Sequence, residues 1–163
     1  MVDLILLQDL IINLGYPGAF LAGLLGSSSL FFAFFPSFIV IPLLATTLDP
    51  MMVGILGGIG AGVGQFLHYF VGLGGRYLIP KKMLRNLDQW RLRLDRYGVV
   101  IIFIFAITPF TPDDLIWLPM GAMRYPKFKA LAAAILGKIG LNLVYAYTGY
   151  FGGSFIQDLL NII

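Results

Sequence analysis

Two adjacent carboxylates are the residues of this sequence best suited to chemistry. Asp113 and Asp114 lie side by side in an otherwise uncharged, apolar run at 99–123. At membrane depth an ionised aspartate costs about 2.5 to 3.5 kcal/mol on insertion scales. Two neighbouring carboxylates in a low-dielectric site resist double ionisation, which suits coupling to a proton. The pair is therefore a candidate site for a proton or another cation.

The same segment also has a purely structural interpretation. Thr111, Pro112, Asp113 and Asp114 have the types and order of the N-cap and the first three positions of a short helix. Thr111 and Asp114 have the spacing of a capping box, and proline is favoured at the first helical position. Pro109 breaks the chain just before them. Helix capping alone and cation binding, with or without capping, are the two alternatives.

A lysine is expected to lie deep in the membrane. Lys138 follows Lys127 by eleven residues, which is about 16 Å along a helix. Asn142 and Tyr145 follow it at i+4 and i+7, so the three side chains share one polar face. This predicts either a salt bridge to the aspartate pair or a site for an anion, and the two interpretations are compatible.

Three further groups are candidates for binding. Pro36 and Ser37 are expected to open a short helix without a carboxylate at its N-terminus, which attracts phosphate; a plain proline break is the alternative. Gln65 and His68 lie one turn apart and are expected to hydrogen-bond across helices, because a lone histidine is poor evidence for a metal site. Arg76 and Arg124 lie at expected span ends, where they contact lipid headgroups or bind a lipid phosphate specifically.

Composition identifies the elements that must position these residues. The chain of 163 residues is 59% hydrophobic and 12% charged, whereas a soluble domain has about 25% charged residues. Ranges 10–48 and 51–75 carry no charge. These features predict membrane-spanning helices in one membrane domain covering residues 1–163. The net charge of +3 is no sign of nucleic-acid binding, and the absence of cysteine excludes disulfides and thiolate chemistry.

The basic residues predict the topology. Seven of them lie between residues 76 and 96, against only two aspartates, which places loop 76–97 in the cytoplasm. After Pro80, apolar residues recur at helical spacing, so an amphipathic helix is expected in the membrane interface. The seven are Arg76, Lys81, Lys82, Arg85, Arg91, Arg93 and Arg96.

A second basic cluster follows the run at 99–123. If both flanks are cytoplasmic, this run must enter and leave on one side, as a re-entrant hairpin of two short helices. Ranges 51–75 and 127–150 are expected to be full spans, and Gly54, Gly58 and Gly62 indicate close helix packing in the first of them. The stretch 10–48 is too long for one crossing, so it should fold back between Ser27 and Pro36.

The two halves of the chain have the same order of elements. A shift of 76 residues aligns two phenylalanines, two prolines, two glycines and two tyrosines. We expect an all-α membrane protein in which halves 1–75 and 76–153 form an inverted repeat of two re-entrant hairpins, each followed by a transmembrane helix. The aligned pairs are Phe34 with Phe110, Pro36 with Pro112, Gly64 with Gly140 and Tyr69 with Tyr145.

These features together resemble the DedA family, also called the VTT or SNARE-associated family, from about residue 15 to 152. The resemblance rests on the stretch 64–76, on the segment 109–114, and on Gly121, Arg124 and Phe128. It implies facing re-entrant hairpins and movement of phospholipids or polyprenyl phosphates between leaflets, driven by a proton or sodium gradient. The chain departs from the common pattern by having Ser37, Gln65 and Thr108 where many members have charged residues.

The sequence therefore predicts a transporter or scramblase of an anionic lipid in the inner membrane of a prokaryote, with H⁺ or Na⁺ as coupling ion. The alternative is a proton- or cation-coupled exporter of small solutes. A purely structural or assembly role is a third interpretation. An enzyme is not expected, because the single histidine has no serine or cysteine nucleophile motif beside it. No cofactor or metal is expected, and a homo-oligomer is compatible with the sequence.

Overall fold

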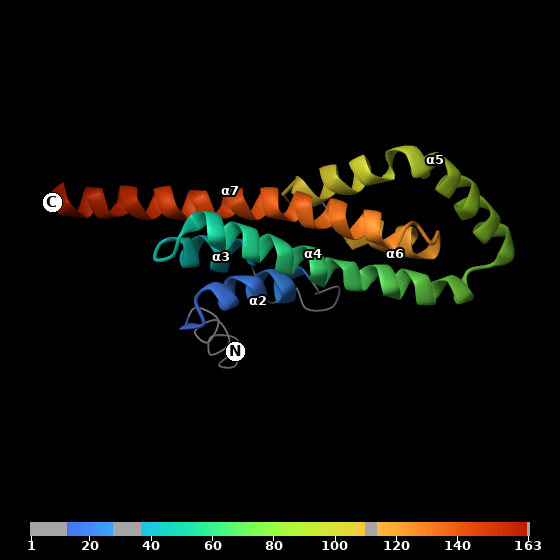
Figure 1. The fold of residues 1–163 in the computed structure, drawn as a ribbon, viewed down its shortest axis with the longest axis horizontal. Helices are drawn as coiled ribbons and strands as arrows, with labels where there is room; N and C mark the ends of the chain where they lie inside the picture. The colour runs from blue at the N-terminus through green and yellow to red at the C-terminus, as the bar shows by residue number, and fades with distance from the viewer. Residues whose placement is uncertain (1–12, 28–36, 110–113, 163) are drawn as a thin grey trace.

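The computed structural model of the chain describes residues 13–27, 37–109 and 114–162, and every element within these ranges is helical (Figure 1). No strand occurs in them. In chain order the elements are α2 (Tyr16–Ser27), α3 (Ser37–Ala45), α4 (Pro50–Gly75), the 3-10 turn η1 (Arg76–Leu78), α5 (Lys81–Ile107), α6 (Asp114–Ala122) and α7 (Lys127–Ile162).

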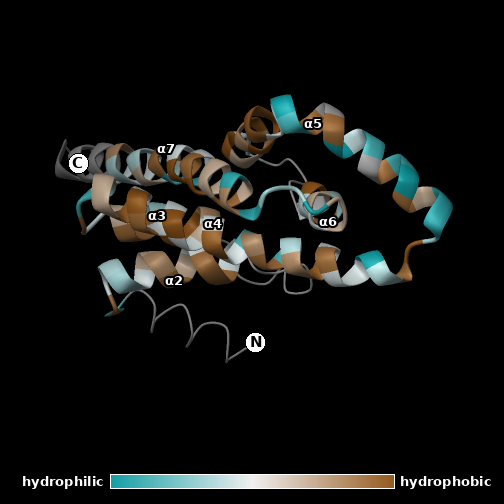
Figure 2. Ribbon diagram, turned by 45° about the vertical axis from the view of Figure 1, so that its right-hand side comes forward, coloured by the Kyte–Doolittle hydropathy of each residue, from teal (hydrophilic) through white to brown (hydrophobic). Residues whose placement is uncertain are grey.

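Two helices are long and apolar enough to cross a membrane. They cover Pro50–Leu78 and Lys127–Gly153, in agreement with the spans predicted at 51–75 and 127–150. The first begins sharply, because the carboxylate of Asp49 accepts a hydrogen bond of 2.8 Å from the N–H of Met52 and Pro50 occupies the first turn. Figure 2 shows that hydrophilic residues gather in the first half of α5, whereas hydrophobic ones dominate α2 and α3.

Glycines bring α4 into close contact with α7. A Cβ atom built on Gly58 would overlap the backbone of Ile139, so no larger residue fits there without moving a helix. The prediction of a packing face is confirmed. Successive glycines along α4 contact residues of decreasing number on α7, so the two helices are antiparallel. The contacts pair Gly54 with Leu143, Gly58 with Ile139 and Gly62 with Ile135.

A second glycine face of α4 packs against α2. Cβ atoms on Gly60 and Gly64 would overlap the carbonyl oxygens of Phe20 and Leu24. Here residues further along α4 contact residues further along α2, so the two helices are parallel. The spanning helix α4 therefore lies between α2 and α7, and its glycines let it approach both closely.

The short helices lie at opposite ends of the two spanning helices. At one end α2 begins and α3 finishes: the hydroxyl of Tyr16 accepts a hydrogen bond of 3.3 Å from the N–H of Asp49, and Gly149 packs against Pro42. At the other end α6 finishes, with Gly121 against the backbone of Tyr69. Each end has its own hydrophobic core, centred on Ile41 and on Trp117, respectively.

The apolar run at 99–123 is broken, as predicted. Helix α5 ends at Ile107 and α6 begins at Asp114. The amphipathic helix also begins after Pro80 as predicted, but it does not stop where the run begins. It continues as one helix from Lys81 to Ile107, with no proline to interrupt it. Within this helix, Gly98 fits closely against the ring of Tyr125. The predicted break between Ser27 and Pro36 lies almost wholly outside the described residues.

Candidate functional site

Four polar side chains are buried in the two spanning helices. The exposed fractions are 1% for Gln65, 2% for His68, 9% for Lys138 and 3% for Asn142. Polar and ionisable groups inside membrane helices are costly to bury and commonly mark a transport path or a proton relay. We call these four residues the buried polar set.

The buried polar set lies between the two hydrophobic cores. Along α4, Gln65 and His68 fall after Val53 of the first core and before Tyr69 of the second. Along α7, Lys138 and Asn142 likewise separate Ala134 of the second core from Ala146 of the first. Polar groups thus occupy the stretch between the two apolar cores, with Lys138 and Asn142 opposite Gly57 and Gly58 on the side of the first core and Gln65 and His68 on the side of the second.

Lys138 and Asn142 share a face of α7, as predicted. The side-chain N–H of Asn142 donates a hydrogen bond of 2.8 Å to the carbonyl oxygen of Lys138. The amide oxygen of Asn142 lies 3.2 Å from the position that a Cβ on Gly57 would take, so this glycine leaves room for the amide. Tyr145, the third residue of the predicted stripe, is half-buried against the first core.

The end of α5 lies at the level of Lys138. Gly137 packs against Ala106, and Gly140 packs against Ile107. The connection from α5 to α6 therefore leaves α5 beside Lys138. Asp113 belongs to this connection and lies outside the described residues, as do Thr111 and Pro112. Asp114 begins α6, but its side chain is not described, so the predicted ion pair with Lys138 is untested.

Gln65 has an unusual environment. Within the described ranges neither its side-chain nitrogen nor its oxygen has a hydrogen-bond partner, so the predicted hydrogen bond across helices is not found there. A buried polar group without a partner costs about 1 to 3 kcal/mol. Its neighbour Phe66 packs edge-on against Trp117 of α6, with ring centroids 6.1 Å apart. A buried amide of this kind is one that an internal water or a ligand could satisfy.

The two arginines lie together at one end of the molecule. The guanidinium of Arg76 donates a hydrogen bond to the carbonyl oxygen of Ala122, the last residue of α6. Arg124 is exposed, has a left-handed backbone with φ of 53°, and donates its N–H to the carbonyl of Gly121. Sequence reasoning predicted lipid contacts for both residues and missed the bond from Arg76 to α6.

The remaining predicted site residues lie at helix ends. Ser37 is the first residue of α3 and is half-buried, whereas Pro36 lies outside the described residues. Pro109 is exposed just beyond α5. The hydroxyl of Tyr69 donates a hydrogen bond of 2.7 Å to the carbonyl of Tyr125, a link between α4 and the start of α7 that the sequence did not indicate.

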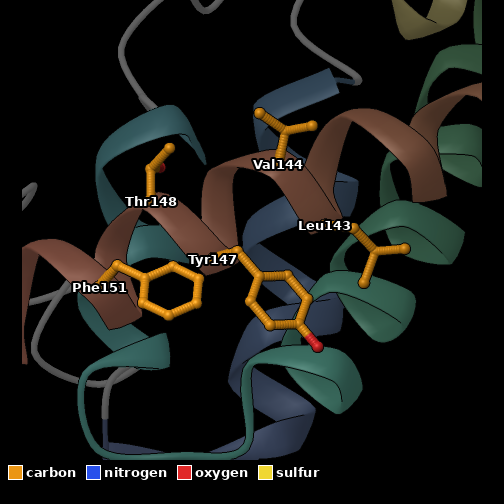
Figure 3. Close-up of a pocket in the computed structure, with 5 residues that line it drawn as sticks. All are labelled: Leu143, Val144, Tyr147, Thr148 and Phe151. Atoms are coloured by element: carbon orange, nitrogen blue, oxygen red, sulfur yellow. The ribbon is translucent and has the colours of Figure 1, made fainter.

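A large pocket on α7 is separate from the buried polar set. It has a volume of about 600 Å³ and is lined by Leu143, Val144, Tyr147, Thr148 and Phe151. Figure 3 shows these side chains along α7, and the rings of Tyr147 and Phe151 are stacked with centroids 6.0 Å apart. Aromatic side chains at a span end are typical of the membrane–water interface. The apolar and aromatic lining of this pocket is thus of the kind found at lipid-facing surfaces.

The helical fold, the two spanning helices and the exposed apolar side chains along them, such as Leu67, Phe70 and Leu136, define a helical membrane protein. A family model of the VTT domain matches residues 35–151, and the chain belongs to the VTT domain family. This confirms the resemblance seen in the sequence. No curated protein and no solved structure matches the chain significantly.

Proposed function

We propose that this protein moves an anionic lipid, a phospholipid or a polyprenyl phosphate, between the two leaflets of the membrane. The observation that carries the proposal is the burial of Lys138, which is 9% exposed in the middle of a spanning helix. A lysine in that position commonly marks a substrate or ion path. A lipid phosphate passing the level of Lys138 would interact with its positive charge.

The arrangement of the short helices supports a path that opens to both sides. We interpret α2 with α3, and the end of α5 with α6, as re-entrant hairpins entering from opposite faces. Helix α2 has 12 residues and α3 has 9, so they reach about 18 Å and 13 Å, well short of a hydrocarbon core of about 30 Å. An inverted repeat of this kind places its binding site near the midplane.

The aspartates are proposed to be the coupling site. In the resting state Asp113 or Asp114 would pair with Lys138, and an arriving phosphate would take that place. The displaced carboxylate could then bind a proton or a sodium ion, because two adjacent carboxylates share a proton readily. Gln65, whose amide has no partner in the described part of the chain, would bind the headgroup through its N–H.

The same acidic segment also suits a proton- or cation-coupled exporter of small solutes. Both functions need the aspartates, but only lipid transport requires exchange between leaflets. In either case we propose that the protein lies in the inner membrane of a prokaryote, with loop 76–97 in the cytoplasm. The basic residues at this end would then face anionic headgroups.

Reconstitution into liposomes distinguishes the two functions. In vesicles carrying a fluorescent anionic lipid, the assay measures movement of the labelled lipid out of the inner leaflet. Parallel vesicles carrying a pH-sensitive dye report proton flux. We expect leaflet exchange faster than in protein-free vesicles. Proton flux without any lipid exchange would select the exporter and reject lipid transport.

A further inference from the structure

An apolar groove lies at the Arg76 end of the molecule, away from the buried polar set. It has a volume of about 410 Å³ and is formed by the last turns of α4, the beginning of α5 and the end of α6. None of the four buried polar residues lines it. Its lining includes Val71, Gly75, Met83, Leu87, Leu118 and Pro119. We call it the elbow groove, because it lies where α4 turns into α5 (Figure 1).

The chemistry of the elbow groove suits a hydrocarbon chain. Its named lining residues carry no polar side chain, so nothing in it recognises a headgroup. Its volume falls within the range of about 300 to 1,000 Å³ typical of small-molecule sites. The first half of α5 above it is amphipathic, with exposed Met83 and Trp90, as in helices that lie in the membrane interface.

The rim of the elbow groove is basic. Arg76 directly follows the lining residue Gly75, and Lys81 and Lys82 directly precede the lining residue Met83. Both lysines are exposed. Between residues 72 and 87 the sequence has four basic residues and no acidic one. An apolar groove beside a cationic rim is complementary to an amphiphile with an anionic head.

We propose that the elbow groove binds one acyl chain of an anionic phospholipid, with the lipid phosphate against Lys81 and Lys82. This site does not rest on the proposed transport function, because it lies outside the buried polar set and needs no movement between leaflets. Its role is to hold a lipid at the end of α6, where α4, α5 and α6 meet.

Glycine positions provide a matched pair of variants. A Cβ on Gly75 or on Gly74 would meet no atom within 4 Å, so a side chain can start from either position without overlapping its neighbours. Only Gly75 lines the groove. Gly75→Phe should therefore fill it, whereas Gly74→Phe adds the same side chain outside it and serves as the control.

The test is native mass spectrometry of detergent-purified protein titrated with phosphatidylglycerol or phosphatidylcholine. We expect the wild type and Gly74→Phe to retain one phosphatidylglycerol and Gly75→Phe to lose it. Lys81→Gln with Lys82→Gln should weaken phosphatidylglycerol binding roughly 30-fold, whereas Lys129→Gln should not. Circular dichroism checks folding. Undiminished binding to folded Gly75→Phe, or equal retention of both lipids by the wild type, would overturn the proposal; if Gly75→Phe does not fold, the lysine variants and the lipid preference decide.

Discussion

The side-chain amide of Asn142 donates a hydrogen bond to the backbone carbonyl of Lys138, one helical turn earlier on α7. Both side chains are buried, and they lie between the hydrophobic cores of the two ends of the molecule. The bond satisfies the amide N–H within α7. The ammonium of Lys138 takes no part in this bond.

Charge pairing at the centre predicts a non-additive pattern of stability. Lys138→Met should destabilise the protein by about 3 to 5 kcal/mol if a carboxylate is left buried without its partner. The double variant Lys138→Met with Asp114→Asn should be more stable than Lys138→Met alone. Unfolding in mixed detergent micelles, followed by circular dichroism, measures the difference. If the losses of unfolding free energy from the two single variants simply add in the double variant, Lys138 does not pair with Asp114. The same comparison with Asp113→Asn tests the other aspartate.

Close packing of α4 predicts a strong position dependence for glycine substitutions. Gly58→Ala should destabilise the protein by about 1 to 3 kcal/mol, because the added methyl overlaps the backbone of Ile139. Gly74→Ala meets no neighbour and should be neutral or stabilising by up to about 1 kcal/mol. Thermal denaturation in detergent compares the two. Equal midpoints would show that α4 and α7 are not in contact at Gly58.

The bond from Arg76 to Ala122 predicts a local effect on α6. Arg76→Gln should lower stability by about 1.5 to 3 kcal/mol, since a hydrogen bond to a charged group is lost. Amide hydrogen exchange should accelerate at the end of α6. Arg85→Gln is the control, because Arg85 is exposed on the same end of the molecule. Unchanged exchange in α6 of Arg76→Gln would exclude this role.

The loop between α6 and α7 predicts sensitivity to alkaline pH. Burial, and then the charge of Asp95, raise the pKa of Tyr125 above its ordinary value of 10.0. Above pH 10.0 the unfolded chain ionises this phenol while the folded protein keeps it neutral, so the free energy of unfolding falls as the pH rises above 10.0. Tyr125→Phe should therefore lose less stability than the wild type between about pH 9 and pH 11, measured by denaturation at each pH. An identical loss in both proteins would contradict this.

Much of the fold follows from local patterns in the sequence. The spans follow from long stretches without charge. The helix start after Pro80 and the break within 99–123 follow from prolines in the same segments. The Gly54, Gly58 and Gly62 face could be predicted because its spacing repeats along one helix. Continuity of α5 through Gly98 was not predicted, since glycine is unfavourable inside a helix and the amphipathic pattern ends where the apolar run begins.

The site could be predicted only in part, for a similar reason. Lys138 and Asn142 were found because they are neighbours on one helix. The contact of Arg76 with Ala122 joins residues 46 positions apart, and no periodicity indicates such a pair. The left-handed conformation of Arg124 was also missed, because glycine or asparagine is the usual signal for it.

The most direct test of the central claim is leaflet exchange by Lys138→Met in liposomes, compared with Lys129→Met. Both substitutions remove one positive charge from α7, but Lys129 is exposed and Lys138 is buried. We predict that folded Lys138→Met exchanges the anionic lipid roughly tenfold to hundredfold more slowly, since a hydrogen bond to a charged group contributes about 1.5 to 3 kcal/mol. Lys129→Met should match the wild type. Wild-type exchange by folded Lys138→Met would contradict the proposal that this lysine binds the passing headgroup.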